Sequence, residues 1–331
     1  MSQTLRWMPA ALGVALLLPA GPARSAPPVA QPVPVRQTAD ARFAVLEHQY
    51  VTYLLWQFPV VATYLGGSAF DPTLAAVDGT LRDYSPDALQ REDARLGEFR
   101  ARFAALAPAR LSARRRIDRS VALAESAFLL REHQVRRYQQ RSLDSYVDEP
   151  FRGVDWQIQG MTATGPSAYG TDAEWQAVIA RVAAVPAYLA TAERQLSAGI
   201  AAHNTPDWRV LAEFGLDSTA ADANYFSRTL PQLAAADIGA AHREALLREL
   251  QVAGDAAAGA YRHLRDFVAR SFFEDSGADG TTPVPRSPYR ADRFAFGASE
   301  YDWALHNNLR LNDSAAALFT ASWPVVERSS A

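Results

Sequence analysis

The stretch "YSPDALQREDARLGEFRARFAAL", residues 84–106, carries helix signals that agree with one another. Ser85 can cap a helix with its hydroxyl oxygen, Pro86 suits the first helical position, and Asp87 places negative charge in the first turn. The apolar residues that follow recur at helical spacing and form one face: Leu89, Leu96, Phe99 and Phe103. The sequence therefore predicts an amphipathic helix that begins at Pro86.

The same spacing continues on both sides of this helix. Upstream, apolar residues from Phe43 to Phe58 define another helix, which Pro59 should kink or end near Gln57 because proline lacks the helical N–H donor. Downstream, residues 111–141 contain neither Gly nor Pro, so we predict one long helix of about eight turns. Its apolar stripe consists of Ile117, Val121, Ala124, Phe128, Val135 and Tyr138.

The rest of the chain alternates between helical patterns and breaks. Residues 142–170 lose the periodicity and hold several glycines, which favours an ordered loop or a pair of short elements. Thr171 and Glu174 have the spacing of a capping box, and Pro186 should split the segment that follows into two helices. After them we predict helices at residues 218–233, 238–273, 299–307 and 314–320, with a Gly- and Pro-rich break at 274–292.

No run of alternating β-branched residues occurs anywhere in the chain. We therefore predict an all-α fold, an irregular multi-helix array with one long helix, Gly/Pro-rich loops and no significant sheet. The expected organisation is a signal peptide at 1–26, a Pro-rich flexible leader at 27–37, a helical domain at 38–320 and an atypical tail at 321–331. Any internal boundary of the helical domain is expected near 142–170.

The N-terminus has the layout of a secretory signal peptide. Arg6 precedes an apolar stretch from Trp7 to Leu18, and small residues end the segment at Ala26. The apolar run is short for a membrane span, although an uncleaved anchor is the main alternative. The chain contains no cysteine, so neither lipoprotein attachment nor thiol catalysis is available to it. We expect a periplasmic or secreted protein with no stable membrane insertion after cleavage.

The charge balance argues against nucleic-acid binding. All 33 basic residues are arginine, and loss of Arg6 and Arg24 with the signal peptide would leave 31 of them against 36 acidic residues, a net charge of −5. A nucleic-acid binder usually shows a positive balance or a concentrated basic face. We therefore expect no nucleic-acid partner.

Motifs for known catalytic chemistry are missing. The six histidines lie more than four residues apart, so no His-Glu-x-x-His pair places two zinc ligands on one helix face. No Gly-x-Ser-x-Gly elbow and no phosphate-binding glycine loop occurs either. Acidic pairs such as Asp148–Glu149 and Glu274–Asp275 are interpreted as solvated groups at helix ends or in loops. The sequence thus indicates no catalytic residue and no metal ligand.

The stretch "GASEYDWALHNNL", residues 297–309, is the remaining candidate. If Ser299 caps a helix there, Glu300 and Tyr301 fall on neighbouring faces, and Glu300 and His306 lie too far apart around the helix to hold one ion. The stretch is either a structural helix with aromatic anchors or one wall of a substrate cleft. The cleft candidates are Glu300, Tyr301 and His306.

Four stretches in order resemble a bacterial family known as domain of unknown function 885. They span residues 58–89, 181–206, 290–319 and, more weakly, 114–126. The resemblance implies a largely helical, often exported, zinc-metallopeptidase-like protein. It also assigns scaffold roles to matched positions: Pro59, Ala62, Thr63, Gly66, Asp71, Gly297, Glu300, Tyr301 and Leu305.

In full-length members the resemblance implies zinc ligands in a downstream half, a His-Glu pair followed by Pro-Gly-His and a later glutamate-bearing helix. Nothing in this sequence matches them. We therefore expect an inactive N-terminal part, truncated before the zinc motif and without a cofactor of its own, whose partner is peptide or a downstream catalytic half. The alternative is a self-contained periplasmic binding or interaction module that lends a cleft wall to a partner. Whether the chain is an enzyme stays open.

Overall fold

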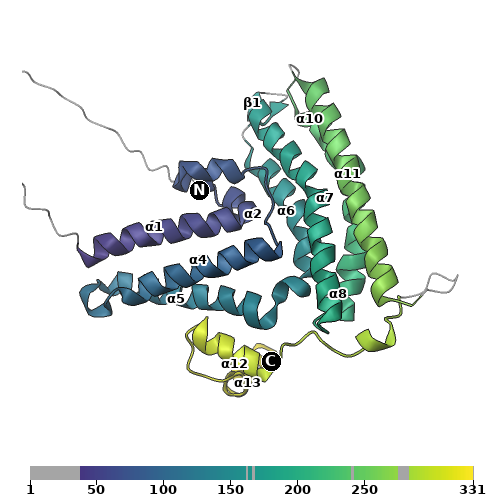
Figure 1. The fold of residues 1–331 in the computed structure, drawn as a ribbon. Helices are drawn as coiled ribbons and strands as arrows, with labels where there is room; N and C mark the ends of the chain where they lie inside the picture. Colours follow the sequence, from purple (N-terminus) through teal and green to yellow (C-terminus); the bar gives the residue numbers. More distant parts are fainter. Residues whose placement is uncertain (1–37, 162, 166–167, 240–241, 275–282, 331) are drawn as a thin grey trace, which may run out of the picture. The chain divides into compact units, whose positions relative to one another are not determined.

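The computed structural model describes residues 38–161, 163–165, 168–239, 242–274 and 283–330, so the expected signal peptide and leader lie outside the described residues. These residues are mainly α-helical (Figure 1). In the described part of the chain the named strands are β1 (Ala163–Gly165) and β2 (Ala168–Tyr169), which pair antiparallel. The all-α prediction is confirmed.

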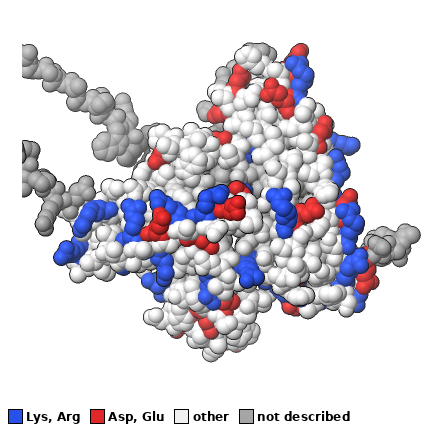
Figure 2. Space-filling model, viewed as in Figure 1, with Lys and Arg blue, Asp and Glu red and all other residues white. Residues whose placement is uncertain are grey.

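One helical layer consists of α1 (Ala39–Gln57), α4 (Pro86–Ala105) and α5 (Ala113–Arg131), which contact one another pairwise. Ser85 caps α4 as predicted, by accepting a hydrogen bond from the backbone N–H of Ala88 at 3.3 Å. Aromatic rings fill the layer: the Tyr50 ring lies edge-on to Phe99 and Phe103, with centroids 5.3 and 5.4 Å away. Figure 2 shows basic and acidic side chains interspersed over one face of the molecule.

The long helix predicted over residues 111–141 is wrong in its second half. The α-helix α5 ends at Arg131, a π-helical turn covers Glu132–Arg136, and a 3-10 turn covers Tyr138–Gln140. Arg137 between the two turns has a φ of 48°, a left-handed conformation that stops a helix. Tertiary contacts accompany the change, because His133 and Gln134 both bond to Asp93 of α4.

The chain between α1 and α4 is folded into short helices. The break predicted at Pro59 is confirmed, since α1 ends at Gln57 and α2 (Pro59–Tyr64) begins at the proline. It is followed by α3 (Gly67–Phe70) and a 3-10 helix, Pro72–Val77. Asp71 caps the latter and also bonds to Thr52 and His48 of α1, which anchors the turn.

The second layer is built from α6 (Leu143–Gly160), α7 (Asp172–Ala201) and α11 (Arg243–Phe272). The loop predicted for residues 142–170 is therefore wrong over α6. Gly153 is a packing residue there rather than a turn residue, because a Cβ at this position would meet Val60 at 2.8 Å and Arg181 at 3.0 Å. The capping box at Thr171 is confirmed, but α7 continues through Pro186 instead of splitting.

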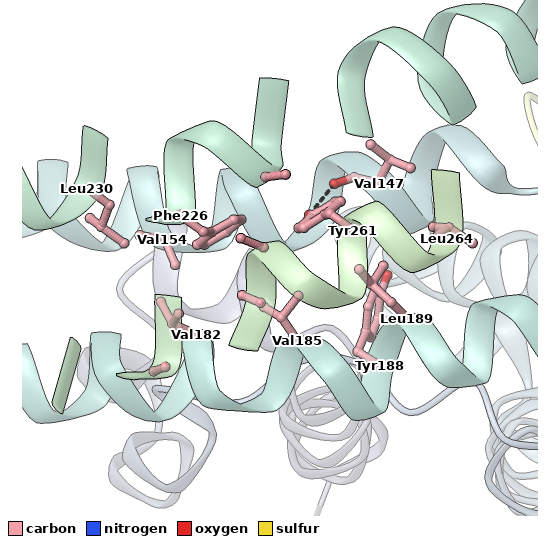
Figure 3. Close-up of a cluster of buried hydrophobic side chains, with 14 of the residues drawn as sticks. Val147, Val154, Val182, Val185, Tyr188, Leu189, Phe226, Leu230, Tyr261 and Leu264 are labelled. Carbon is pink, nitrogen blue, oxygen red and sulfur yellow. Dashed lines mark hydrogen bonds between the residues drawn. The ribbon is translucent and has the colours of Figure 1, made fainter. Parts of the chain in front are cut away.

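Short segments complete this layer. They are α8 (Trp208–Ala212), a π-helical turn (Glu213–Ser218), α9 (Thr219–Asn224), a second π turn (Tyr225–Thr229) and α10 (Leu230–Asp237). Figure 3 shows the core they share with α6, α7 and α11. In it the Tyr261 ring stacks against Phe226, with centroids 5.6 Å apart, and its hydroxyl donates to the carbonyl oxygen of Val147 at 2.8 Å.

The C-terminal segment forms α12 (Ala298–Asn307) and α13 (Ala315–Ser330). Gly297, with a φ of 91°, is the N-cap of α12, so Ser299 lies inside the helix and does not cap it. The last helix passes through Pro324 and takes in residues 321–330, beyond the end predicted at 320. No helix in the described part of the chain is long and apolar enough to cross a membrane.

Candidate functional site

Glu300 of α12 is engaged in an ion-pair network with α5 and the π turn that follows it. Its carboxylate accepts hydrogen bonds from the guanidinium of Arg131, at 2.9 Å through Nε, and from Arg136, at 3.2 Å. These bonds, led by that from Arg131, lower the pKa of the Glu300 carboxyl. Arg131 also covers the ring of Trp303 at 4.4 Å. The network therefore fastens α12 to α5.

The other two cleft candidates have different surroundings. Tyr301 is 57% exposed. The two ring nitrogens of His306 lie 2.8 Å from the carbonyl oxygen of Asp302 and 3.1 Å from that of Asn312. The structure therefore does not bring Glu300, Tyr301 and His306 together on a common atom, and their role as a cleft wall stays a prediction.

The described residues do not bring together the His, Asp or Glu side chains that a zinc ion needs as ligands. Within them, no group of three or more His, Asp or Glu side chains is placed to hold a metal ion. Four histidines instead bond to single carboxylates: His48 to Asp71, His133 to Asp93, His242 to Asp172 and His263 to Glu193. We derive no metal chemistry from this arrangement.

A cavity of about 230 Å³ opens between the start of α2, the segment before α4 and one face of α6. Most of its wall is apolar and aromatic, and two carboxyl groups enter it. Its lining residues are Phe58, Val60, Val61, Tyr84, Ser145, Asp148, Glu149, Arg152 and Trp156. We call it the Glu149 cavity.

The acidic pair Asp148–Glu149 was interpreted from the sequence as solvated groups at a helix end or in a loop, which is wrong for Glu149. Both residues lie within α6. Glu149 accepts a hydrogen bond from the Tyr188 hydroxyl at 2.9 Å and a long one from the backbone N–H of Arg82 at 3.4 Å. Burial raises the pKa of its carboxyl. Asp148 is ion-paired with Arg152 one turn later.

Behind the cavity, Arg82 lies buried with 6% of its surface exposed. Its guanidinium donates to both carboxylate oxygens of Glu92, at 3.0 and 3.1 Å, and lies 3.3 Å from Nε2 of His133. The same group covers the Phe58 ring at 3.9 Å. The guanidinium of Arg82 is therefore hydrogen-bonded to residues of α4 and the π turn, and it acts on the Glu149 carboxylate only through its charge.

Arg181 of α7 is fully buried and does not line the cavity. It donates to the carbonyl oxygens of Thr80 and Gly153, at 3.0 and 2.7 Å, and to the side chains of Gln157 and Thr63, both at 2.8 Å. Burial lowers its pKa to about 10. One side chain thus ties α7 to α2, α6 and the intervening loop, which gives Thr63 a structural role.

A second hollow, of about 710 Å³, runs between the outer face of α5 and residues 308–310. Ile117 and Val121 line it and are 66% and 59% exposed, so the stripe predicted to be buried faces solvent at these positions. Leu309 faces the same hollow and is 60% exposed. We call Ile117, Val121 and Leu309 the apolar face.

The buried carboxyl was hidden from sequence reasoning because nothing local marks it. Asp148 and Glu149 are separated from Tyr188, Arg82 and Arg181 by tens of residues, and only the packing of α6 against α7 brings them together. The only sequence signal for a helix around Glu149 was its helical spacing, which the intervening glycines concealed.

Asp222 of α9 is a second perturbed carboxyl. Burial, together with the nearby charge of Asp148, raises its pKa to about 7.

Comparison with known proteins gives the family and the fold. No curated protein matches the chain. A solved structure from Shewanella oneidensis, described as a "putative lipoprotein of unknown function", superposes with a TM-score of 0.61 at 17% identity. The match covers 86% of this chain and 46% of that one, so this chain spans less than half of its length. Because the model of the family "Bacterial protein of unknown function (DUF885)" matches residues 59–331, the chain belongs to that family.

Proposed function

We propose that this chain is an exported helical protein that forms the non-catalytic part of a metallopeptidase-like assembly, without peptidase activity of its own. The observation that carries the proposal is the apolar face. Contiguous exposed apolar surface is uncommon on soluble monomers and usually marks an interaction site. Ile117, Val121 and Leu309 meet this description around a hollow of about 710 Å³.

The occupant that fits this surface best is a further helical region bearing the catalytic residues. The similar chain from Shewanella oneidensis has more than half of its length outside the match, which is room for such a region. The ion pairs of Glu300 hold α12 against α5, so the hollow is formed before any partner arrives. A preformed surface reduces the ordering cost of association.

Export is part of the proposal. It rests on the signal-peptide layout of residues 1–26. The description of the similar protein as a lipoprotein supports a location in the cell envelope. Cysteine-linked lipid would not be the means of attachment here, because this chain has no cysteine.

An activity assay tests the non-catalytic role. The purified chain is incubated with a broad peptide mixture and zinc, with and without a chelator, and the products are separated by mass spectrometry. We expect no cleavage above the buffer control. Zinc-dependent turnover that the chelator abolishes would refute the proposal.

A paired set of variants tests the apolar face. Ile117→Ser combined with Val121→Ser should reduce binding of a hydrophobic fluorescent dye and any concentration-dependent self-association. Val252→Ser, at a position 72% exposed on α11, is the matched control and should leave both unchanged. If the wild type, the Ile117→Ser/Val121→Ser variant and Val252→Ser all bind the dye equally, the apolar face is not an interaction surface.

The second candidate is a self-contained periplasmic binding or interaction module. It is favoured by the core in Figure 3, which α6, α7, α9, α10 and α11 complete among themselves. A monodisperse monomer that melts cooperatively and binds no dye would favour this module over the docking proposal.

A further inference from the structure

The Glu149 carboxyl is buried in a cavity wall and forms no direct ion pair, although the charges of Arg82 and Arg181 act on it at longer range. Its hydrogen bonds come from a phenol, Tyr188, and from one long backbone N–H contact. The two nearest buried guanidinium groups are engaged elsewhere, Arg82 with Glu92 and Arg181 with four acceptors on neighbouring segments. Within the described part of the chain, no Arg or His side chain bonds to Glu149.

A carboxylate has about four lone-pair positions, so two accepted bonds leave acceptor capacity free on Glu149. Burying a charge without a counter-charge is costly, and the cost is relieved by a proton or by a cation that enters the cavity. The rest of the wall includes Arg152, whose charge is paired with Asp148, and its other residues suit the uncharged part of such a cation. Phe58, Val60 and Trp156 supply apolar and aromatic surface.

We propose that the Glu149 cavity binds a primary ammonium group carried on a short apolar or aromatic stem. The ammonium group donates to the Glu149 carboxylate, and the stem lies against Phe58, Val60 and Trp156. The volume of about 230 Å³ admits one such group and lies below the usual range for drug-sized ligands.

The cavity is lined by α2 and α6, whereas the apolar face lies on α5 and the segment that follows α12. Amine binding therefore does not depend on a catalytic partner. The ammonium group can belong to a free small molecule or to a lysine side chain of a peptide, and the test includes a probe for each source.

The experiment is isothermal titration calorimetry of the full chain with phenethylammonium chloride and with its uncharged counterpart 2-phenylethanol. We expect the amine to bind at least about tenfold more tightly than the alcohol. Equal affinity for the two, or binding of neither, would overturn the inference. N-acetyl-lysine methylamide is the third probe: affinity similar to that of phenethylammonium indicates a peptide side chain as the source, and much weaker affinity indicates a free amine.

Two variants locate the site. Glu149→Gln should lower the affinity for the amine to that for the alcohol, whereas Glu98→Gln, a surface carboxylate on α4, should change neither. Val61→Trp fills the cavity from a position 40% exposed, so it should abolish binding of both ligands without disturbing the core. If Glu149→Gln does not fold, Val61→Trp alone tests whether the amine binds in the Glu149 cavity. Unchanged amine affinity in Val61→Trp would place binding elsewhere and refute the proposal.

Discussion

Gly254 and Gly259 lie in the interior of the same helix, α11, and alanine at the two positions should have opposite effects on stability. A Cβ added at Gly254 would lie 2.2 Å from the carbonyl oxygen of Phe226 and 3.2 Å from its carbon. A Cβ added at Gly259 would meet nothing within 4 Å. The pair therefore isolates the packing of α11 against the π turn that carries Phe226.

The magnitude follows from two opposing terms. Alanine is favoured over glycine in a helix interior by about 0.5–1 kcal/mol, and this gain applies at both positions. At Gly254 the clash is with backbone, so α11 and the π turn must separate by roughly 1 Å. Overpacking of this kind typically costs about 1–3 kcal/mol. Gly254→Ala should lose about 1–2 kcal/mol, and Gly259→Ala should gain about 0.5–1 kcal/mol.

The assay is urea unfolding followed by circular dichroism at 222 nm, with the slope of the transition checked for two-state behaviour. We expect the two variants to differ by about 2 kcal/mol in the free energy of unfolding, with Gly259→Ala the more stable. If Gly254→Ala is as stable as Gly259→Ala, the close approach of Phe226 to α11 is incorrect, and so is the core drawn in Figure 3.

Three further outcomes are expected. Glu300→Gln should speed amide hydrogen exchange in residues 298–330 only, because it removes the bridge to α5, whereas Glu327→Gln on exposed α13 should not. Folding raises the pKa of the Asp222 carboxyl from 3.8 to about 7, so the unfolded chain loses its proton first and the wild type loses stability as pH rises through this range. The stability of Asp222→Asn relative to the wild type should therefore be greater at pH 8 than at pH 4 by about 4 kcal/mol, roughly three pKa units at about 1.4 kcal/mol each, as measured by urea unfolding at both pH values. Arg181→Met should lower the free energy of unfolding by about 3 kcal/mol, because buried acceptors lose their donor. Its control, Arg95→Met, removes a surface ion pair and should lower the free energy of unfolding by less than about 0.5 kcal/mol in the same urea assay.

Residues that act within one turn of helix were predictable from the sequence. Ser85 and Thr171 mark helix starts through contacts with neighbours three positions away, and Pro59 marks the end of the preceding helix near Gln57; all three predictions are confirmed. The all-α class follows from the same local periodicity. Family membership was also visible, since matched stretches in order need no knowledge of how they pack.

Burial was not predictable, because it depends on neighbours that are distant in sequence. Glycine at position 153 looked like a loop signal, but it allows α6 to approach Val60 and Arg181. Ile117 and Val121 had the spacing of a buried face, yet no described helix covers them. The motif at Glu300 allowed either a structural helix or a cleft wall, and the sequence could not indicate that its carboxylate bonds to Arg131 and Arg136.

The sequence by itself thus determined the helical class, several helix starts and the family, since each is set by local hydrogen bonding and by residue pattern. Only the tertiary structure decided which charges are buried. Glu149 is an ordinary acidic residue in the sequence, and the packing of α6 against α7 removes it from water beside Tyr188. Desolvation is a property of the assembled core, so the cavity around this carboxyl appears only when the helices come together.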